Sequence, residues 1–301
     1  MQFYLTDPFQ ASCIKTVFDC SPPDVLYHYT RREGLLGILE KRSVYASHIR
    51  YLNDAHEMAH AMDLIQTILK VRLAVATGDQ KQLYEQVKQW VESLKFQNQV
   101  FVFSMSQDGD SLSQWRAYCN SNDGYAIGFD TQKLSQHANS QFFYMAPCVY
   151  DHEAQDALIS LLLEDVNDDF QKRIQSSVND AINQASAYFV LLFLILAPVL
   201  KAPAFKEEKE WRLISIAKHG FGQPSVQYRN GRSLLIPYVA MEIAPKDDQL
   251  PIAEVVVGPT EETISPTSHR ILEQTAVMGL LINANASGRV ARSSTVPYRG
   301  A

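Results

Sequence analysis

The stretch from Asp24 to Glu40 constrains the fold more than any other part of the chain. Its first residues, DVLYHY, combine aromatic and aliphatic side chains directly after a Ser-Pro-Pro breaker, which is typical of a short strand. From Arg31 onward, leucine and isoleucine recur at helical spacing in the segment GLLGIL. Thr30 and Glu33 have the spacing of a capping box, in which two side chains close the first helical turn. The sequence therefore predicts a strand that leads directly into a helix.

Two polar side chains of this strand are predicted to point the same way. Successive residues of a strand alternate between faces, so Leu26, His28 and Thr30 share one face and Tyr29 lies on the other. An imidazole and a hydroxyl are then neighbours, which suits a ligand-binding site. The structural alternative is that Thr30 only caps the helix and that His28 is a partly buried strand residue.

The composition is that of an ordinary globular chain, and it limits the possible partners. The 301 residues are 46% hydrophobic and 20% charged, which is enough to bury a sizeable core in one elaborated domain, residues 1–301. A net charge of -6 argues against a general nucleic-acid-binding surface, although a local basic groove stays open. The four cysteines form no C-x-x-C pair, and the N-terminal residues lack the pattern of a secretion signal. We therefore expect a cytoplasmic protein.

Two long helical insertions are predicted, at about residues 54–97 and 151–200, from apolar residues at helical spacing. The second insertion ends in residues 187–200, AYFVLLFLILAPVL, which are almost wholly apolar. This run is shorter than the roughly 20 residues that span a bilayer, and it contains Pro198. We therefore expect a buried core helix and no membrane contact.

The remaining apolar runs are short and alternate with turn residues, which is typical of strands. Strands are predicted at residues 43–47, 100–104, 124–129, 208–216, 234–238, 241–244, 253–258 and near Tyr298. Shorter helices are predicted at residues 111–118 and 265–278, and residues 1–23 read as a peripheral lead-in. The motifs G-x-G-x-x-G and G-x-x-x-x-G-K-[ST] are absent, so a doubly wound nucleotide fold is not expected. The pattern predicts an α+β fold.

The segment FKEEKEWRLIS, residues 205–215, brings charged residues into an apolar strand pattern. As a strand it places Glu208, Glu210 and Arg212 on one face and Trp211 on the other. Such charges usually form a solvated edge. Acidic residues between core positions are also the way in which an active site aims a carboxylate, and both interpretations stay open.

Several blocks of the sequence resemble, in the same order, a bacterial family called domain of unknown function 2971. They are LYHYT with GLLGILE, RYLND, FVFSMSQDGDSLSQWRAYCNSNDGYAIGFD, EEKEWRL, VVVGP and the terminal VPYR. That family is in turn similar to the ADP-ribosyltransferase fold, in particular to the histidine-class branch that includes poly(ADP-ribose) polymerases and DNA-modifying toxins. The resemblance implies an ADP-ribosyltransferase-like split β-sheet core with helical insertions, and NAD as the substrate.

The resemblance also implies roles for individual residues. His28 and Thr30 match the histidine-x-serine/threonine signature that holds the adenosine-side ribose and the nicotinamide amide. Glu210 matches the late-strand glutamate that binds the nicotinamide ribose. Where the branch usually carries tyrosine on its second motif strand, this chain has Phe103. The other residues implied around NAD are Tyr29, Arg50, Ser104, Trp115 and Tyr118, with no metal.

The chemistry of this reaction needs side chains of these kinds. Cleavage of the nicotinamide glycosidic bond produces an oxocarbenium-like ribose, which a carboxylate such as Glu210 stabilises, as in glycosidases. Glu208, on the same predicted face, would bind or deprotonate the acceptor. The acceptor stays open: a protein, a nucleic acid, a small molecule or water. Family analogy suggests a toxin or phage-defence component, and the alternative is a non-catalytic module that binds a nucleotide or a partner on the same scaffold.

A second motif, HEMAH, suggests a different enzyme class. His56 and His60 stand four residues apart on a predicted helix, so both imidazoles could bind zinc, with Glu57 as the general base of a hydrolase. The glycine and third histidine of the metzincin extension are absent. Asp54 and Glu57 also have capping-box spacing, which gives Glu57 a structural role. We keep this motif as an alternative and assign no metal site.

Overall fold

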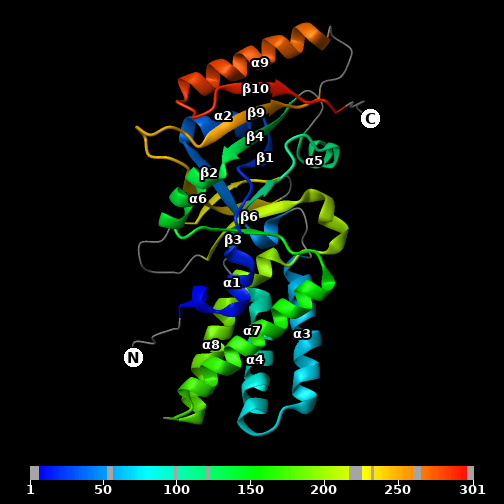
Figure 1. Ribbon diagram of the computed structural model, residues 1–301, viewed down its shortest axis with the longest axis vertical. Helices are drawn as coiled ribbons and strands as arrows, with labels where there is room; N and C mark the ends of the chain where they lie inside the picture. Colours follow the sequence, from blue (N-terminus) through cyan, green and yellow to red (C-terminus); the bar gives the residue numbers. More distant parts are fainter. Residues whose placement is uncertain are drawn as a thin grey trace.

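The computed structural model describes residues 7–52, 57–97, 100–119, 123–175, 177–216, 226–231, 234–259 and 266–296. Figure 1 shows an elongated molecule with two parts stacked along its long axis. One end is a β-sheet with helix α9 on its outer side, and the other end is a bundle of long helices.

Within the described residues, ten strands form one mixed sheet. Its order is β10-β9-β4-β1-β3-β2-β8-β7, with β6 paired to β3 and β5 paired to β6. All pairings are antiparallel except that of β10 with β9, so the sheet is not a doubly wound parallel one. The strands are β1 (Val25–Arg31), β2 (Ser43–His48), β3 (Val100–Ser106), β4 (Gly124–Asp130), β5 (Tyr144–Pro147), β6 (Glu210–Ile216), β7 (Gln227–Asn230), β8 (Leu235–Glu242), β9 (Ile252–Val257) and β10 (Val290–Ser293).

Four long helices form two hairpins between strands, α3 with α4 and α7 with α8, and the other helices lie singly before, between or after strands. This arrangement confirms the predicted α+β class. The α-helices are α1 (Ser12–Phe18), α2 (Arg32–Lys41), α3 (Glu57–Val75), α4 (Gly78–Gln97), α5 (Leu112–Tyr118), α6 (Thr131–Ser140), α7 (His152–Arg173), α8 (Val178–Leu196) and α9 (Pro266–Asn283). Short 3-10 turns are η1 (Pro8–Gln10), η2 (Ile49–Tyr51), η3 (Ala197–Val199) and η4 (Pro203–Glu208).

Strand β3 shows that the sheet is covered on both faces. Val100 and Val102 belong to an apolar cluster with the bundle helices, whereas Phe101 and Phe103 belong to a second cluster with α2, α6 and α9. All four side chains are buried. A strand that is buried on both faces reads as a continuous apolar run, as VFVF does here. Burial of each such side chain stabilises the fold by roughly 1.5–3 kcal/mol.

Helix α8 is the most apolar element of the bundle. By length and composition, the segment Val178–Val199 is able to cross a membrane, but 67% of its most apolar window is buried inside the structure. α8 contacts α4 and α7, and its rings Phe189 and Phe193 stack with their centroids 5.6 Å apart. The prediction of a buried core helix is confirmed.

The N-terminal residues are not the peripheral lead-in that the sequence suggests. Helix α1 packs against α7 and α8, and Cys13, Ile14 and Val17 on one of its faces are buried. The backbone N–H groups of Ser12 and Cys13 donate to the carboxylate of Asp165 in α7, at 3.0 and 2.9 Å. This cap comes from a distant residue, so local sequence patterns could not reveal it.

The predicted capping box at the start of α2 is wrong. Thr30 lies within β1, opposite Tyr125 of β4, and Arg31 is the residue that precedes the helix, without a side-chain cap. Pairing with β4 extends the strand past the predicted cap position. The Thr30 hydroxyl lies against Gly34 instead: a Cβ atom on this glycine would be 1.9 Å from Oγ1.

Other differences concern element boundaries. Residues 235–242 form one continuous strand, β8, where two strands are predicted, because β8 pairs with β2 along this length. α6, β5 and β7 have no counterpart among the predicted elements. Asp54, His56 and Tyr298 lie outside the described residues.

Candidate active site

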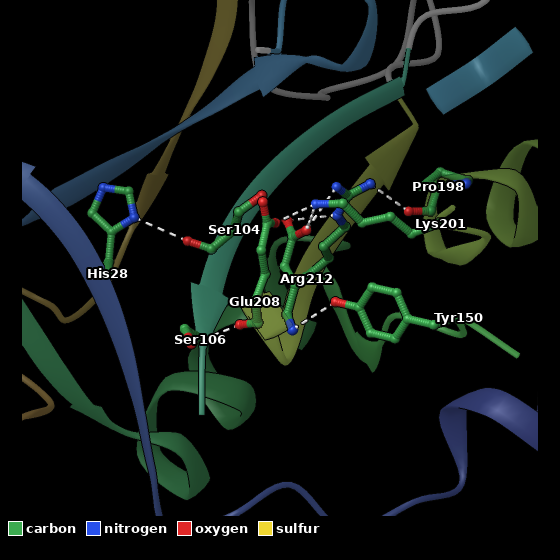
Figure 2. Close-up of polar contacts among 9 residues, drawn as sticks. His28, Ser104, Ser106, Tyr150, Pro198, Lys201, Glu208 and Arg212 are labelled. Atoms are coloured by element: carbon green, nitrogen blue, oxygen red, sulfur yellow. Dashed lines mark hydrogen bonds and ion pairs between the residues drawn. The ribbon is translucent and has the colours of Figure 1, made fainter. Parts of the chain in front are cut away.

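The candidate site forms where strands β1 and β3 separate. Within the described residues these two strands pair only at Tyr27 opposite Ser106, whereas β1 pairs along its whole length with β4. His28 fills the gap that follows. Its Nδ1 lies 2.9 Å from the carbonyl oxygen of Ser104 (Figure 2), and its ring centroid lies 4.4 Å from that of Phe103.

The hydrogen bond of His28 identifies the nitrogen that carries the hydrogen, and burial sets the charge of the ring. A carbonyl oxygen only accepts, so Nδ1 carries the hydrogen and donates it to Ser104. Burial lowers the pKa of His28 to about 4, although the hydrogen bond to Ser104 acts in the opposite direction and raises it. The ring is therefore neutral at pH 7, and Nε2 is an acceptor.

A small cavity lies beside His28 and is built from distant parts of the chain. Its volume is about 40 Å³, which is room for on the order of three water molecules. Residues from β1, β3, α5, η4 and β6 line it: Tyr27, His28, Tyr29, Ser104, Met105, Ser106, Gln114, Tyr118, Glu208 and Glu210. His28 and Glu210, which are far apart in the sequence, therefore border the same space.

Glu210 borders this cavity and lies between two cations. Arg212 donates from Nε to Oε1 at 2.8 Å and from Nη2 to Oε2 at 3.0 Å, and the ammonium group of Lys201 donates to Oε2 (Figure 2). Arg212 also donates from Nη1 to the carbonyl oxygen of Pro198 at 2.6 Å. Burial alone would raise the pKa of Glu210, but the charges of Arg212 and Lys201 outweigh it and hold the pKa at about 2. This carboxylate is ionised at pH 7.

Glu208 does not lie on the strand that the sequence predicts. It ends the 3-10 turn η4, and Lys209 has a left-handed backbone, with φ 45°, before β6 begins at Glu210. The turn is held by Ser106, whose hydroxyl donates to the carbonyl oxygen of Glu208 at 2.7 Å. Glu208 nevertheless reaches the same cluster, because Lys201 donates to its carboxylate. One ammonium group thus bridges two carboxylates.

The two carboxylates differ in their electrostatics. Burial raises the pKa of Glu208, and the bond from Lys201 opposes this rise only in part. The Glu208 side chain is 20% exposed, against 7% for Glu210. Glu208 is therefore the more accessible carboxylate and the one that more readily takes up a proton.

Aromatic and amide groups complete the surroundings of the cluster. The hydroxyl of Tyr150 accepts the backbone N–H of Glu210 at 2.9 Å (Figure 2). Burial raises the pKa of Tyr118 to about 12, and the charges of Glu208 and Glu210 add to this rise. Tyr118 is consequently a neutral phenol on the α5 side of the cavity, next to Gln114.

Three of the residues that the family resemblance implies lie away from the cavity. Thr30 faces Gly34 in α2, Arg50 is exposed in η2, and Trp115 is buried with its indole N–H bonded to Asp110. The remaining six border the cavity: His28, Tyr29, Ser104, Tyr118, Glu208 and Glu210.

Sequence reasoning missed the two cations as site residues. Arg212 is predicted on the same face as Glu210, and a buried strand arginine in that position needs a carboxylate partner, so this signal was present in the sequence. Lys201 follows the apolar run of α8 and η3 and is 4% exposed. In the sequence, a lysine after such a run indicates the end of a helix. Its role as a partner of Glu208 and Glu210 becomes visible only in the structure, where η4 and β6 lie beside it.

The zinc motif is only half described. The Nε2 atom of His60 is 3.0 Å from the side-chain oxygen of Gln155, whose amide nitrogen donates to the carbonyl oxygens of Val149 and Lys201. Because that oxygen accepts, Nε2 of His60 carries a hydrogen and offers no lone pair. His56 lies outside the described residues, and those described contain no group of three possible metal ligands.

Comparison with known proteins gives one match. The model of a family described as "Protein of unknown function (DUF2971)" matches residues 114–213, which include most of α5, the Lys201 to Arg212 cluster and the first half of β6. The resemblance to domain of unknown function 2971 is thereby confirmed over these residues. No curated protein and no solved structure matches the chain.

Proposed function

We propose that this chain, which belongs to the DUF2971 family through residues 114–213, cleaves the nicotinamide glycosidic bond of NAD and transfers ADP-ribose to an acceptor. The observation that carries the proposal is that His28 of β1, Glu208 of η4 and Glu210 of β6 all border the same cavity. The separation of β1 from β3 beside His28 supports an ADP-ribosyltransferase-like split sheet.

The contacts of the cluster support different roles for the two carboxylates. Both oxygens of Glu210 already accept bonds from Arg212 or Lys201, so Glu210 is the fixed anion that orders the cluster. The Glu208 side chain is more exposed to solvent than that of Glu210 and also borders the cavity. We assign to Glu208 the contact with the ribose, where an ionised carboxylate stabilises developing positive charge, and the deprotonation of the acceptor.

The opposite wall supports recognition of the nicotinamide riboside. Neutral His28 presents an acceptor at Nε2, which suits a ribose hydroxyl. Tyr27 and Tyr118 border the cavity and supply aromatic surface for the nicotinamide ring.

The cavity must widen before NAD binds. Small-molecule sites enclose roughly 300–1,000 Å³, whereas this cavity measures about 40 Å³. α5 and η4 form two of its borders, and η4 is a short turn that Lys209 alone separates from β6. We expect η4 to shift away from α5, which keeps its position, when NAD enters.

Release of nicotinamide from NAD tests the proposal. The purified protein is incubated with NAD, alone and with cell extract as a source of acceptors, and free nicotinamide is measured by chromatography. Glu208→Gln and His28→Ala should lower the initial rate by about a hundredfold or more. Glu207→Gln is the matched control, since Glu207 is an exposed neighbour in the same turn. Nicotinamide release that is equal in all four proteins would overturn the assignment.

One observation favours a second candidate, a non-catalytic module that binds a nucleotide. Glu210 is fully paired, and the cluster as a whole balances two cations with two carboxylates. Such a balanced network also suits a purely structural role, in which no carboxylate takes part in a reaction. Calorimetry separates the candidates: saturable heat on titration with NAD, together with no nicotinamide after prolonged incubation, supports the binding module.

A further inference from the structure

Asp110 joins three parts of the chain on the outer side of α5. Its Oδ1 accepts the indole N–H of Trp115 at 2.9 Å and the hydroxyl of Ser294. Its Oδ2 accepts the backbone N–H of Thr295 at 2.7 Å and the hydroxyl of the same residue at 2.9 Å. Burial alone would raise the pKa of Asp110, but these hydrogen bonds lower it, so the group is a carboxylate at pH 7.

The C-terminal partners of Asp110 are themselves fixed to the sheet. Ser294 follows β10, and its backbone N–H donates to the carbonyl oxygen of Val257 in β9 at 2.7 Å. The hydroxyl of Ser294 also accepts the N–H of Val296 at 3.1 Å. Asp110 is therefore bonded to a segment that the sheet holds in place.

Trp115 transmits this restraint to the cavity wall. It is 2% exposed, and its ring contacts that of Tyr29 with centroids 4.7 Å apart. α5 has seven residues, so a shift of Trp115 displaces the whole helix, including Gln114 and Tyr118 at the cavity.

The loop before α5 is fastened in the same way from the other side. The hydroxyl of Tyr29 donates to the carbonyl oxygen of Asp108 at 2.7 Å and accepts the N–H of Ser111 at 2.9 Å. Asp110 lies between these two residues. Tyr29 thus ties the loop to β1, the strand of His28, and Asp110 ties it to the C-terminal segment.

We propose that Asp110 is a positioning residue for NAD: through Trp115 and the C-terminal segment, it holds α5 where Gln114 and Tyr118 meet the substrate. This inference rests on the proposed function. Asp110 is not among the residues that border the cavity, so it acts on binding through α5 rather than on the reacting atoms.

Asp110→Asn is the test variant, because an amide keeps one acceptor oxygen but cannot accept the two bonds from Thr295 with its nitrogen. Asp130→Asn is the matched control: Asp130 also accepts a backbone N–H, from Lys133, but it caps α6 away from the cavity. Thr295→Val removes one hydroxyl bond and leaves the backbone bond, so it should give an effect of the same kind and smaller size.

Two measurements are made on each variant: amide hydrogen exchange without substrate, and the KM and kcat of nicotinamide release. In Asp110→Asn, exchange of residues 107–119 should become about tenfold faster while that of α7 stays unchanged, and the KM for NAD should rise about tenfold with kcat within about twofold. Asp130→Asn should match the wild type in both measurements.

Exchange of residues 107–119 at the wild-type rate in Asp110→Asn would overturn the positioning role. A fall in kcat at constant KM would overturn it as well, because the residue would then act on the chemical step. If the wild type does not cleave NAD at all, the proposed function fails, and the exchange measurement still decides whether Asp110 fixes α5.

Discussion

Arg212 binds both carboxylate oxygens of Glu210, with Nε 2.8 Å from Oε1 and Nη2 3.0 Å from Oε2. The two side chains are 1% and 7% exposed. Removing water from such a pair is costly, and each charge depends on the other for compensation. The cluster around the cavity is therefore sensitive to the loss of one member, which makes its role in stability measurable.

Arg212→Met should lower the free energy of unfolding by about 3–5 kcal/mol, because it leaves Glu210 with Lys201 as its remaining cation. The double variant Arg212→Met with Glu210→Gln should be more stable than Arg212→Met alone, since it removes the unbalanced carboxylate. Urea unfolding provides the measurement. Arg116→Met, at an exposed position of α5, serves as the control and should change stability by less than about 0.5 kcal/mol. A double variant no more stable than Arg212→Met would contradict this account.

The acid limb of the stability curve should depend on Glu210. In the folded protein its pKa is about 2, below the ordinary value of 4.5, so the unfolded chain binds this proton more readily. The resulting stabilisation is present above pH 4.5 and is lost as the pH falls toward 2. Unfolding free energies measured across this window should fall less steeply for Glu210→Gln than for the wild type; equal slopes would contradict the prediction.

Glu208 should act with the opposite sign. Burial raises its pKa, so the folded protein binds this proton more readily than the unfolded chain, and protonation of Glu208 adds stability as the pH falls. Glu208→Gln should therefore steepen the acid limb that Glu210→Gln flattens. The same unfolding series measures both slopes, and a flatter limb in Glu208→Gln would show that the two carboxylates do not differ in this way.

His28 should contribute to stability in a separate pH window. Its pKa is about 4 in the folded state, against an ordinary value of 6.5, so the unfolded chain takes up the proton first as the pH falls. Stability is full above pH 6.5 and declines between 6.5 and 4. His28→Gln should remove this decline, whereas His152→Gln, at an exposed position of α7, should keep it. Thermal midpoints across this window are the measurement, and parallel curves for the wild type and His28→Gln would argue against a buried neutral imidazole.

The elements that sequence patterns predict well are those whose burial is visible in the residues themselves. VFVF in β3 and the apolar run of α8 contain no charged residue, so burial in the core is expected for both. VLYHY in β1 is followed directly by a helical pattern. The site is harder, because its groups meet through tertiary contacts. The sequence places Glu210 between core positions of a strand, but its pairing with Lys201 depends on how η3, η4 and β6 come together. Asp165 as the cap of α1 is a long-range contact of the same kind.

Thr30 shows how local chemistry misleads when a tertiary contact competes with it. Its spacing from Glu33 matches a capping box, but pairing with β4 keeps Thr30 in the strand. The hydroxyl then lies against Gly34 in the first turn of α2, and this glycine provides the space for it. No rule of helix capping contains this information, because it depends on which strand lies next to β1.

This contact can be tested with two glycines of the same helix. A Cβ atom at Gly34 would lie 1.9 Å from Thr30 Oγ1, whereas one at Gly37 meets nothing within 4 Å. Gly34→Ala should destabilise the protein by about 1–3 kcal/mol through this overlap. Gly37→Ala should stabilise it by up to about 1 kcal/mol, since alanine is the better helix former and has free space. Thr30→Ala in the Gly34→Ala background should recover most of the loss, because it removes the clashing oxygen. Chemical denaturation of the four proteins decides the matter: similar unfolding free energies for the two alanine variants would mean that Thr30 does not lie against α2.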